Sequence, residues 1–93
     1  MKAIVDGHVI AESESMIESD GYHYFPPSAV RLDCLEKTPK TASDLECPHG
    51  VRFYDVVVDG VRHARNAWVY EAPLPAKQQI ANFVGFWKDV KIV

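Results

Sequence analysis

The sequence predicts a compact, mainly β protein: an antiparallel β sandwich, roll or partly open barrel of about seven short strands with one or two short helical turns. Three observations predict this class. Runs rich in β-branched and aromatic residues recur at close spacing, Asp-Gly and proline turns separate them, and only brief segments favour a helix. An α+β fold is the alternative. A chain of 93 residues is long enough for one core, so we expect a single domain over residues 1–93.

The first half of the chain begins with a predicted hairpin. "MKAIV" and "HVIAES" flank Asp6-Gly7, a dipeptide that accepts the positive φ angles of a two-residue type I′ turn. Residues 13–21 are mostly polar and predict a loop, and the aromatic strand "YHYF" ends at Pro26-Pro27. "PPSAVRLDCLE" predicts one or two helical turns, and "KTPKTASDLE" predicts a surface loop.

The second half contains the strongest strand, "VRFYDVVVDG", which ends at Asp59-Gly60. Both of its faces are largely apolar, which predicts a central strand covered on two sides. "NAWVYEAP" predicts the next strand, in which Trp68 and Tyr70 share a face. A short helix is predicted from Pro75, and "NFVGFW" and "VKIV" are predicted to form a closing strand pair around Lys88-Asp89.

The composition argues against several classes of partner. Ten Lys and Arg residues against 13 Asp and Glu give a net charge of -3, and the basic residues are scattered, so no nucleic acid is expected. No apolar stretch approaches the roughly 20 residues that cross a bilayer, and the first residues do not resemble a signal peptide. We therefore expect a cytoplasmic protein without a membrane partner, in which Cys34 and Cys47 are free thiols.

Seven segments occur in the order and spacing of a known bacterial family. They are "GHVIAES", "HYFPPSAV", "L-E-K-T", "ECPHG", "FYDVVVDG", "NAWVYEAP" and "IANFVGFWKDVKI", which are distributed over nearly the whole chain. The ordered combination resembles the bacterial domain of unknown function 427 (DUF427). This resemblance implies a small β-rich single domain without a known activity, and the nucleotidyltransferase label sometimes attached to the family has no motif behind it here.

One turn departs from the family pattern. Similar sequences usually continue from Cys-Pro into Lys-Gly-x-Ala, whereas this chain has Cys47-Pro48-His49-Gly50-Val51, a shorter turn without the lysine. Cys47 and His49 are candidate catalytic residues, because a nearby imidazolium can activate a thiol and loop residues two apart can point to one side. The same residues also predict a rigid strand entry with a packed thiol, which is the interpretation we favour.

No metal site and no cofactor are expected. Structural zinc sites have C-x2-C or H-x3-H spacing, which the cysteines and histidines of this chain lack. His8, His23 and His63 are predicted to be surface residues of strands or turns. Asp55 interrupts an apolar strand and is predicted to pair with a cation such as Arg52 or Arg65.

Aromatic residues form the second candidate site. Tyr22, Tyr24, Trp68, Tyr70 and Trp87 lie on predicted strands, and if their faces meet they build an apolar recess edged with hydroxyl and indole donors. The alternative is that these rings fill the core. The predicted ligand-binding residues are Tyr24, Tyr54, Trp68, Tyr70 and Arg52.

Three functions are compatible with the sequence. The first is a binding module, in which the recess, rimmed by the Cys47–His49 turn, takes a small molecule or a peptide edge. The second is an enzyme with Cys47 as nucleophile and His49 as base. The third is a structural interaction domain that binds another protein or a second copy, so that the protein is a monomer or a homodimer.

Overall fold

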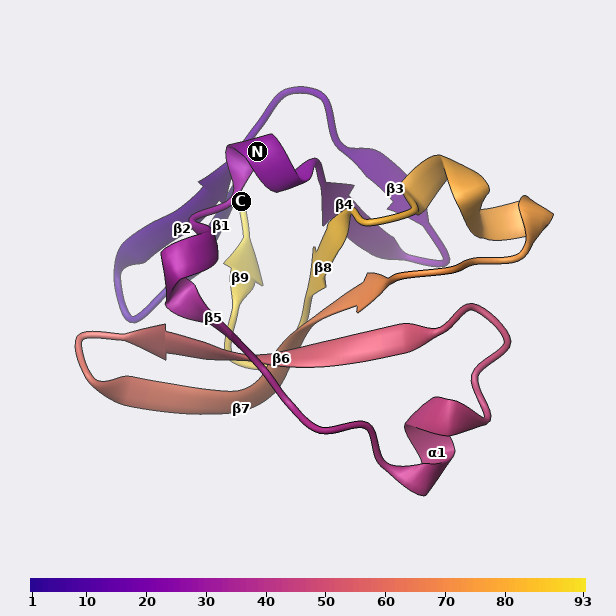
Figure 1. The fold of residues 1–93 in the computed structure, drawn as a ribbon. Helices are drawn as coiled ribbons and strands as arrows, with labels where there is room; N and C mark the ends of the chain where they lie inside the picture. Colours follow the sequence, from indigo (N-terminus) through magenta and orange to yellow (C-terminus); the bar gives the residue numbers. More distant parts are fainter.

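The computed structural model describes residues 1–93 and contains two antiparallel sheets (Figure 1). The small sheet has the order β2-β1-β9 and comprises β1 (Lys2–Val5), β2 (His8–Glu12) and β9 (Lys91–Ile92). The large sheet has the order β3-β4-β8-β7-β6-β5 and comprises β3 (Ile17–Ser19), β4 (Tyr22–Phe25), β5 (Leu35–Lys37), β6 (Val51–Val58), β7 (Val61–Tyr70) and β8 (Val84–Phe86). The mainly β antiparallel class is confirmed, with nine strands and no closure into a barrel.

Three hairpins have an Asp-Gly turn between their strands. Asp6, Asp20 and Asp59 have φ angles of 50°, 53° and 51°, and each is followed by a glycine that also has a positive φ. The first turn joins β1 to β2 as predicted. The other two join β3 to β4 and β6 to β7, so the expectation of a loop over residues 13–21 is wrong: its Asp20-Gly21 turn is a hairpin signal.

Helical structure is confined to short segments. The two stretches that begin with proline form 3-10 turns as predicted, η1 (Pro27–Ala29) with η2 (Leu32–Cys34) after it, and η3 (Pro75–Ile80). The predicted surface loop before Cys47 instead contains the helical turn α1 (Ala42–Leu45), which a capping box between Thr41 and Asp44 stabilises. None of these helices is long and apolar enough to cross a membrane.

The two C-terminal strands do not pair with each other, so that prediction is wrong. β8 lies between β4 and β7 in the large sheet, whereas β9 pairs with β1 in the small sheet. The Lys88-Asp89 segment carries the chain from one sheet to the other. Backbone hydrogen bonds of 2.7 and 2.9 Å between Lys2 and Val93 hold the two termini side by side (Figure 1).

The small sheet packs on one face of the large sheet. Their shared aliphatic core joins residues such as Val5 and Ile10 of the small sheet to Phe25, Val56 and Val84 of the large one. Because side chains alternate along a strand, the neighbouring residues of the large sheet point to the opposite face. That second face carries a separate aromatic cluster, built around Tyr24, Val51, Trp68 and Ile80.

Candidate functional site

A row of four residues crosses the large sheet on its aromatic face. In the strand register Tyr24 pairs with Gly85, Gly85 with Trp68, and Trp68 with Phe53. Gly85 leaves the space in which the Tyr24 and Trp68 rings meet edge to face, with centroids 5.8 Å apart. A Cβ at Gly85 would lie 2.7 Å from Trp68 Cε2 and 3.0 Å from Tyr24 Cε2. Close ring packing therefore requires a glycine here.

Tyr22 and Trp87 lie on the same face, two positions in the sequence from Tyr24 and Gly85. Tyr22 meets Trp68 edge to face at 5.0 Å and Trp87 at 6.4 Å, and the two indoles lie 5.3 Å apart at 68°. Some of these rings, with Val51 and Tyr70, which pair with each other in the strand register, border a hollow of about 150 Å³ that we call the aromatic recess. It is lined by Tyr22, Val51, Phe53, Trp68, Tyr70 and Trp87.

Exposure differs across the aromatic recess. Trp68 is only 5 % exposed and Val51 only 7 %, whereas Tyr22 is 38 % exposed. Tyr24 lies beneath the lining and is 2 % exposed, and this burial raises the pKa of its hydroxyl. The recess thus has a rigid, buried side and an accessible edge at Tyr22.

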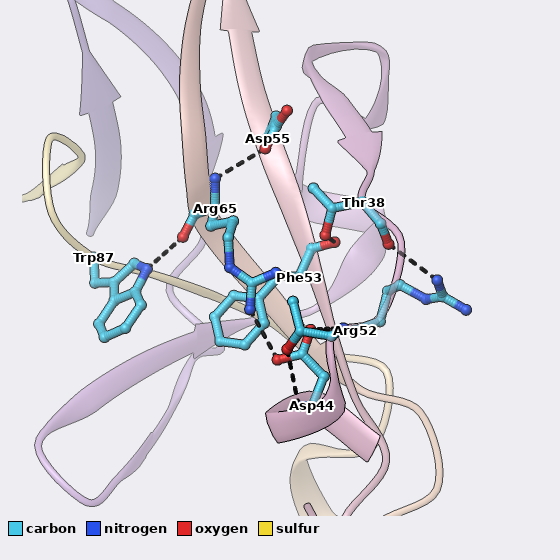
Figure 2. A network of polar contacts seen from close by, with 8 residues as sticks. Thr38, Asp44, Arg52, Phe53, Asp55, Arg65 and Trp87 are labelled. Atoms are coloured by element: carbon cyan, nitrogen blue, oxygen red, sulfur yellow. Dashed lines mark hydrogen bonds and ion pairs between the residues drawn. The ribbon is translucent and has the colours of Figure 1, made fainter. Parts of the chain in front are cut away.

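Arg65 connects two lining rings of the aromatic recess (Figure 2). The indole Nε1 of Trp87 donates a 2.6 Å hydrogen bond to the Arg65 carbonyl oxygen. The Arg65 guanidinium lies 4.0 Å above the centroid of the Phe53 ring, and Phe53 in turn stacks on Trp87 at 6.0 Å. The same residue therefore orients Trp87 through its backbone and covers Phe53 with its side chain.

An irregularity between β6 and β7 places Arg65. The register shifts between Tyr54 and Val56, and Arg65 adopts a left-handed φ of 56°. The Asp55 carboxylate accepts the Arg65 backbone N–H at 2.9 Å. This carboxylate also pairs with Arg62 at 2.7 Å, so the expected partners of Asp55 need correction: the side-chain cation is Arg62, and Arg65 contributes only its amide.

The Arg65 side chain ends at α1 (Figure 2). Its Nη2 donates a 2.8 Å hydrogen bond to Asp44 Oδ1, and Asp44 is 5 % exposed. The same carboxylate accepts the Thr41 backbone N–H at 3.0 Å in the capping box. These hydrogen bonds, the one from Arg65 first, hold the pKa of Asp44 below its ordinary value against the effect of burial. A partly buried ion pair thus holds Arg65 beside the aromatic recess.

The predicted ligand-binding residues divide between the two faces of the large sheet. Trp68 and Tyr70 line the aromatic recess, and Tyr24 supports it from below. Tyr54 and Arg52 alternate with Phe53 and point to the other face. Tyr54 lines a separate groove of about 290 Å³, and Arg52 donates a 3.1 Å hydrogen bond to the Thr38 carbonyl.

Cys47 and His49 lie in a tight turn beside the aromatic cluster. The His49 ring meets Tyr70 edge to face at 5.4 Å, and its Nδ1 accepts a 3.0 Å hydrogen bond from the Leu74 backbone N–H. Cys47 is half-buried against the same cluster, and its carbonyl accepts the Gly50 N–H. No hydrogen bond joins the thiol to the imidazole.

His63 lies at the junction of the two sheets, away from the aromatic recess. Its Nε2 is 2.7 Å from Asp6 and its Nδ1 is 3.0 Å from Asp89, and these two carboxylates raise the pKa of the imidazole. The side chain is 13 % exposed, so this strand residue reaches the surface only in part. No three His, Cys, Asp or Glu side chains gather in a way that could hold a metal ion.

Sequence reasoning did not select Val51, Phe53, Arg65 or Asp44 as site residues. The first two carried a usable signal, because they alternate on the face of one strand opposite Trp68 and Tyr70. Asp44 also carried one, since Thr41-x-x-Asp44 has the form of a capping box. Arg65 carried none, because a strand irregularity that local sequence does not specify sets its position.

The family model described as "Domain of unknown function (DUF427)" matches residues 1–93. No curated protein matches the sequence.

Proposed function

Because this chain belongs to the family described as a domain of unknown function (DUF427), we propose its function from geometry alone: it is a binding module whose aromatic recess holds a compact group of a small molecule or peptide.

The observation that carries the proposal is a hollow surrounded by rings. Five aromatic side chains and Val51 line about 150 Å³ of space that no side chain of the protein fills. Atoms at the wall of a hollow lose dispersion contacts that a close-packed core would supply. A bound group that enters the aromatic recess restores these contacts and removes apolar surface from water.

The dimensions limit what can enter. Whole drug-sized ligands occupy pockets of roughly 300–1,000 Å³, whereas a cavity of about 150 Å³ accommodates a molecule of the size of benzene. The aromatic recess therefore suits one compact end of a larger ligand. The remainder would leave past Tyr22, the most exposed of the lining side chains.

The contacts of Cys47 and His49 give less support to a cysteine-dependent enzyme. The Nδ1 of His49 already accepts a backbone hydrogen bond, and its ring packs on Tyr70. These contacts give the imidazole a structural role in stabilising the turn. The pair lacks the mutual hydrogen bond that usually joins a nucleophile to its base. The Cys47–His49 turn is better explained as one wall of the aromatic cluster.

A fragment screen tests the proposed function. We expect at least one compact fragment to raise the melting temperature of the protein, and a fragment at ten times its Kd adds about 1.4 kcal/mol to the free energy of unfolding. Tyr22→Ala should abolish this stabilisation, because it removes the accessible wall of the recess. The control Tyr54→Phe, on the opposite face, should keep it. A screen without any stabilising fragment, or equal stabilisation of Tyr22→Ala, contradicts the proposal.

A further inference from the structure

We propose that the group recognised by the aromatic recess is a trimethylammonium cation, carried by a choline-like small molecule or by a trimethylated lysine side chain. This inference rests on the proposed function and specifies the chemistry of its ligand.

The arrangement of the rings is the first argument. Tyr22, Trp68 and Trp87 are close to mutually perpendicular, with interplanar angles of 87°, 79° and 68°. Their centroids lie 5.0 to 6.4 Å apart, and all three rings line the aromatic recess, so a group held there is near several rings at once. The electron-rich face of a ring attracts a cation within about 6 Å of its centroid, and several rings around one cation add their attractions.

The cations of the protein itself supply the second argument. Two of the lining rings already hold a positive group over their faces: Arg65 lies 4.0 Å from the centroid of Phe53, and Lys88 Nζ lies 4.9 Å from that of Trp87. The Arg65 charge is paired with Asp44, which limits its repulsion of a bound cation. Lys88 forms no ion pair and is the remaining like charge beside the recess.

The absence of carboxylates from the lining selects the kind of cation. A primary ammonium carries three N–H donors, and burying them without acceptors costs free energy. The lining offers rings, two tyrosine hydroxyls and the side chain of Val51, but no carboxylate. A quaternary ammonium has no N–H group to satisfy and presents methyl groups to the rings. It therefore gains the electrostatic attraction at a smaller desolvation cost.

The experiment compares three probes that differ in charge and in carrier. They are choline, Nα-acetyl-trimethyllysine amide and 3,3-dimethylbutan-1-ol, in which carbon replaces the quaternary nitrogen of choline. Binding is followed by the indole N–H resonances of Trp68 and Trp87 in isotope-labelled protein. We expect at least one charged probe to bind about tenfold more tightly than the neutral alcohol. The tighter of the two charged probes identifies the carrier as a free molecule or a side chain.

Two failures are distinguishable. If the neutral alcohol binds as tightly as both charged probes, the cation inference is overturned while the recess remains a binding site. If no probe binds, the cation inference is overturned as well, and the fragment screen then decides the proposed function independently.

Substitutions separate charge from packing. Lys88→Gln removes the unpaired cation near Trp87, so the affinity for the charged probe should rise roughly twofold while that for the neutral alcohol stays unchanged. Tyr22→Leu keeps an apolar wall without a π face, so it should reduce the affinity for the charged probe several-fold more than the affinity for the neutral one. The control Tyr54→Phe should change neither. Equal changes for both probes in Lys88→Gln and Tyr22→Leu would overturn the inference.

Discussion

The two faces of the large sheet are built from adjacent residues of the same strands, yet different parts of the chain cover them. Tyr24 and Trp68 point to one face, and their neighbours Phe25 and Val69 point to the other. The small sheet covers most of the aliphatic face, which keeps a groove of about 290 Å³ beside Tyr54, Val69 and Val84. The aromatic face is covered by short segments such as η3 and the turn at Cys47, and it retains a hollow.

This difference suggests separate roles: the aliphatic face contributes mainly to stability, and the aromatic face is available for recognition. The aliphatic face stabilises the fold through the burial of small and branched side chains between two sheets. The aromatic face orders its rings through edge-to-face contacts and through the Asp44–Arg65 pair, and part of its surface stays accessible. We therefore expect substitutions on the aliphatic face to act mainly on folding and those at the edge of the recess mainly on binding.

The largest effect is expected from Phe25→Ala. Phe25 is fully buried in the shared core, where it packs against Phe86 with ring centroids 5.9 Å apart. Removing a buried phenylalanine leaves a cavity and costs about 3–5 kcal/mol. Urea unfolding measures the loss. The matched variant on the other face, Tyr22→Ala, should cost less than about 1 kcal/mol because Tyr22 is partly exposed. Similar losses for both would contradict the comparison.

A smaller effect is expected from Gly85→Ala. The added Cβ meets the Trp68 indole at 2.7 Å, and overpacking of this kind costs about 1–3 kcal/mol. The φ angle of Gly85 is not positive, so the cost reports ring packing and not backbone strain. Denaturant unfolding gives the change in stability, and near-ultraviolet circular dichroism reports the altered ring contacts. An unchanged spectrum with full stability would contradict the role assigned to Gly85.

Asp44→Asn tests the ion pair beside the aromatic recess. Loss of the charged hydrogen bond to Arg65 should cost about 1–2 kcal/mol at neutral pH. The folded-state pKa of Asp44 is lowered, so its stabilising contribution is present above the ordinary value for aspartate and is lost as the pH falls through the lowered value. The stability difference between the native protein and Asp44→Asn should therefore shrink in acid. If this stability difference does not change with pH, Asp44 stabilises the protein only as a helix-capping residue, which contradicts the role assigned to the ion pair.

The smallest effect concerns His63, at the junction of the sheets. Its folded-state pKa is raised, so its contribution is fully present below the ordinary histidine pKa and is lost as the pH rises through the raised value. Stability should decline modestly as the pH rises above about 6.5. His63→Gln should remove that decline, and ligand binding in the aromatic recess should stay unchanged. Urea unfolding at several pH values measures it; an identical pH profile for both proteins would exclude the assigned role.

Local signals in the sequence were enough for most strands and turns, but not for β3 (Ile17–Ser19), which was expected to be a loop, or β5 (Leu35–Lys37), which overlaps the predicted helical stretch. The Asp6-Gly7 and Asp59-Gly60 turns and the position of β6 inside a sheet, between β5 and β7, were predicted because a dipeptide or one apolar run encodes each of them. The partners of β8 and β9 were not, because pairing between strands distant in the chain depends on the complete fold.

The candidate site was predicted in part for the same reason. Alternation places Trp68 and Tyr70 on one face, and it also places Tyr54 on the other, which makes Phe53 the member of β6 that lines the recess. The position of Arg65 depends on a register shift between β6 and β7, which the residues of neither strand reveal alone.

The central claim is that the aromatic face holds a ligand group within its rings. The most direct measurement is of nuclear Overhauser contacts between the methyl protons of bound choline or trimethyllysine and the ring protons of Tyr22, Trp68 and Trp87. Our account predicts contacts to all three rings and none to Tyr54 on the opposite face. Contacts to Tyr54 instead, or binding that leaves all three rings without contacts, would contradict it.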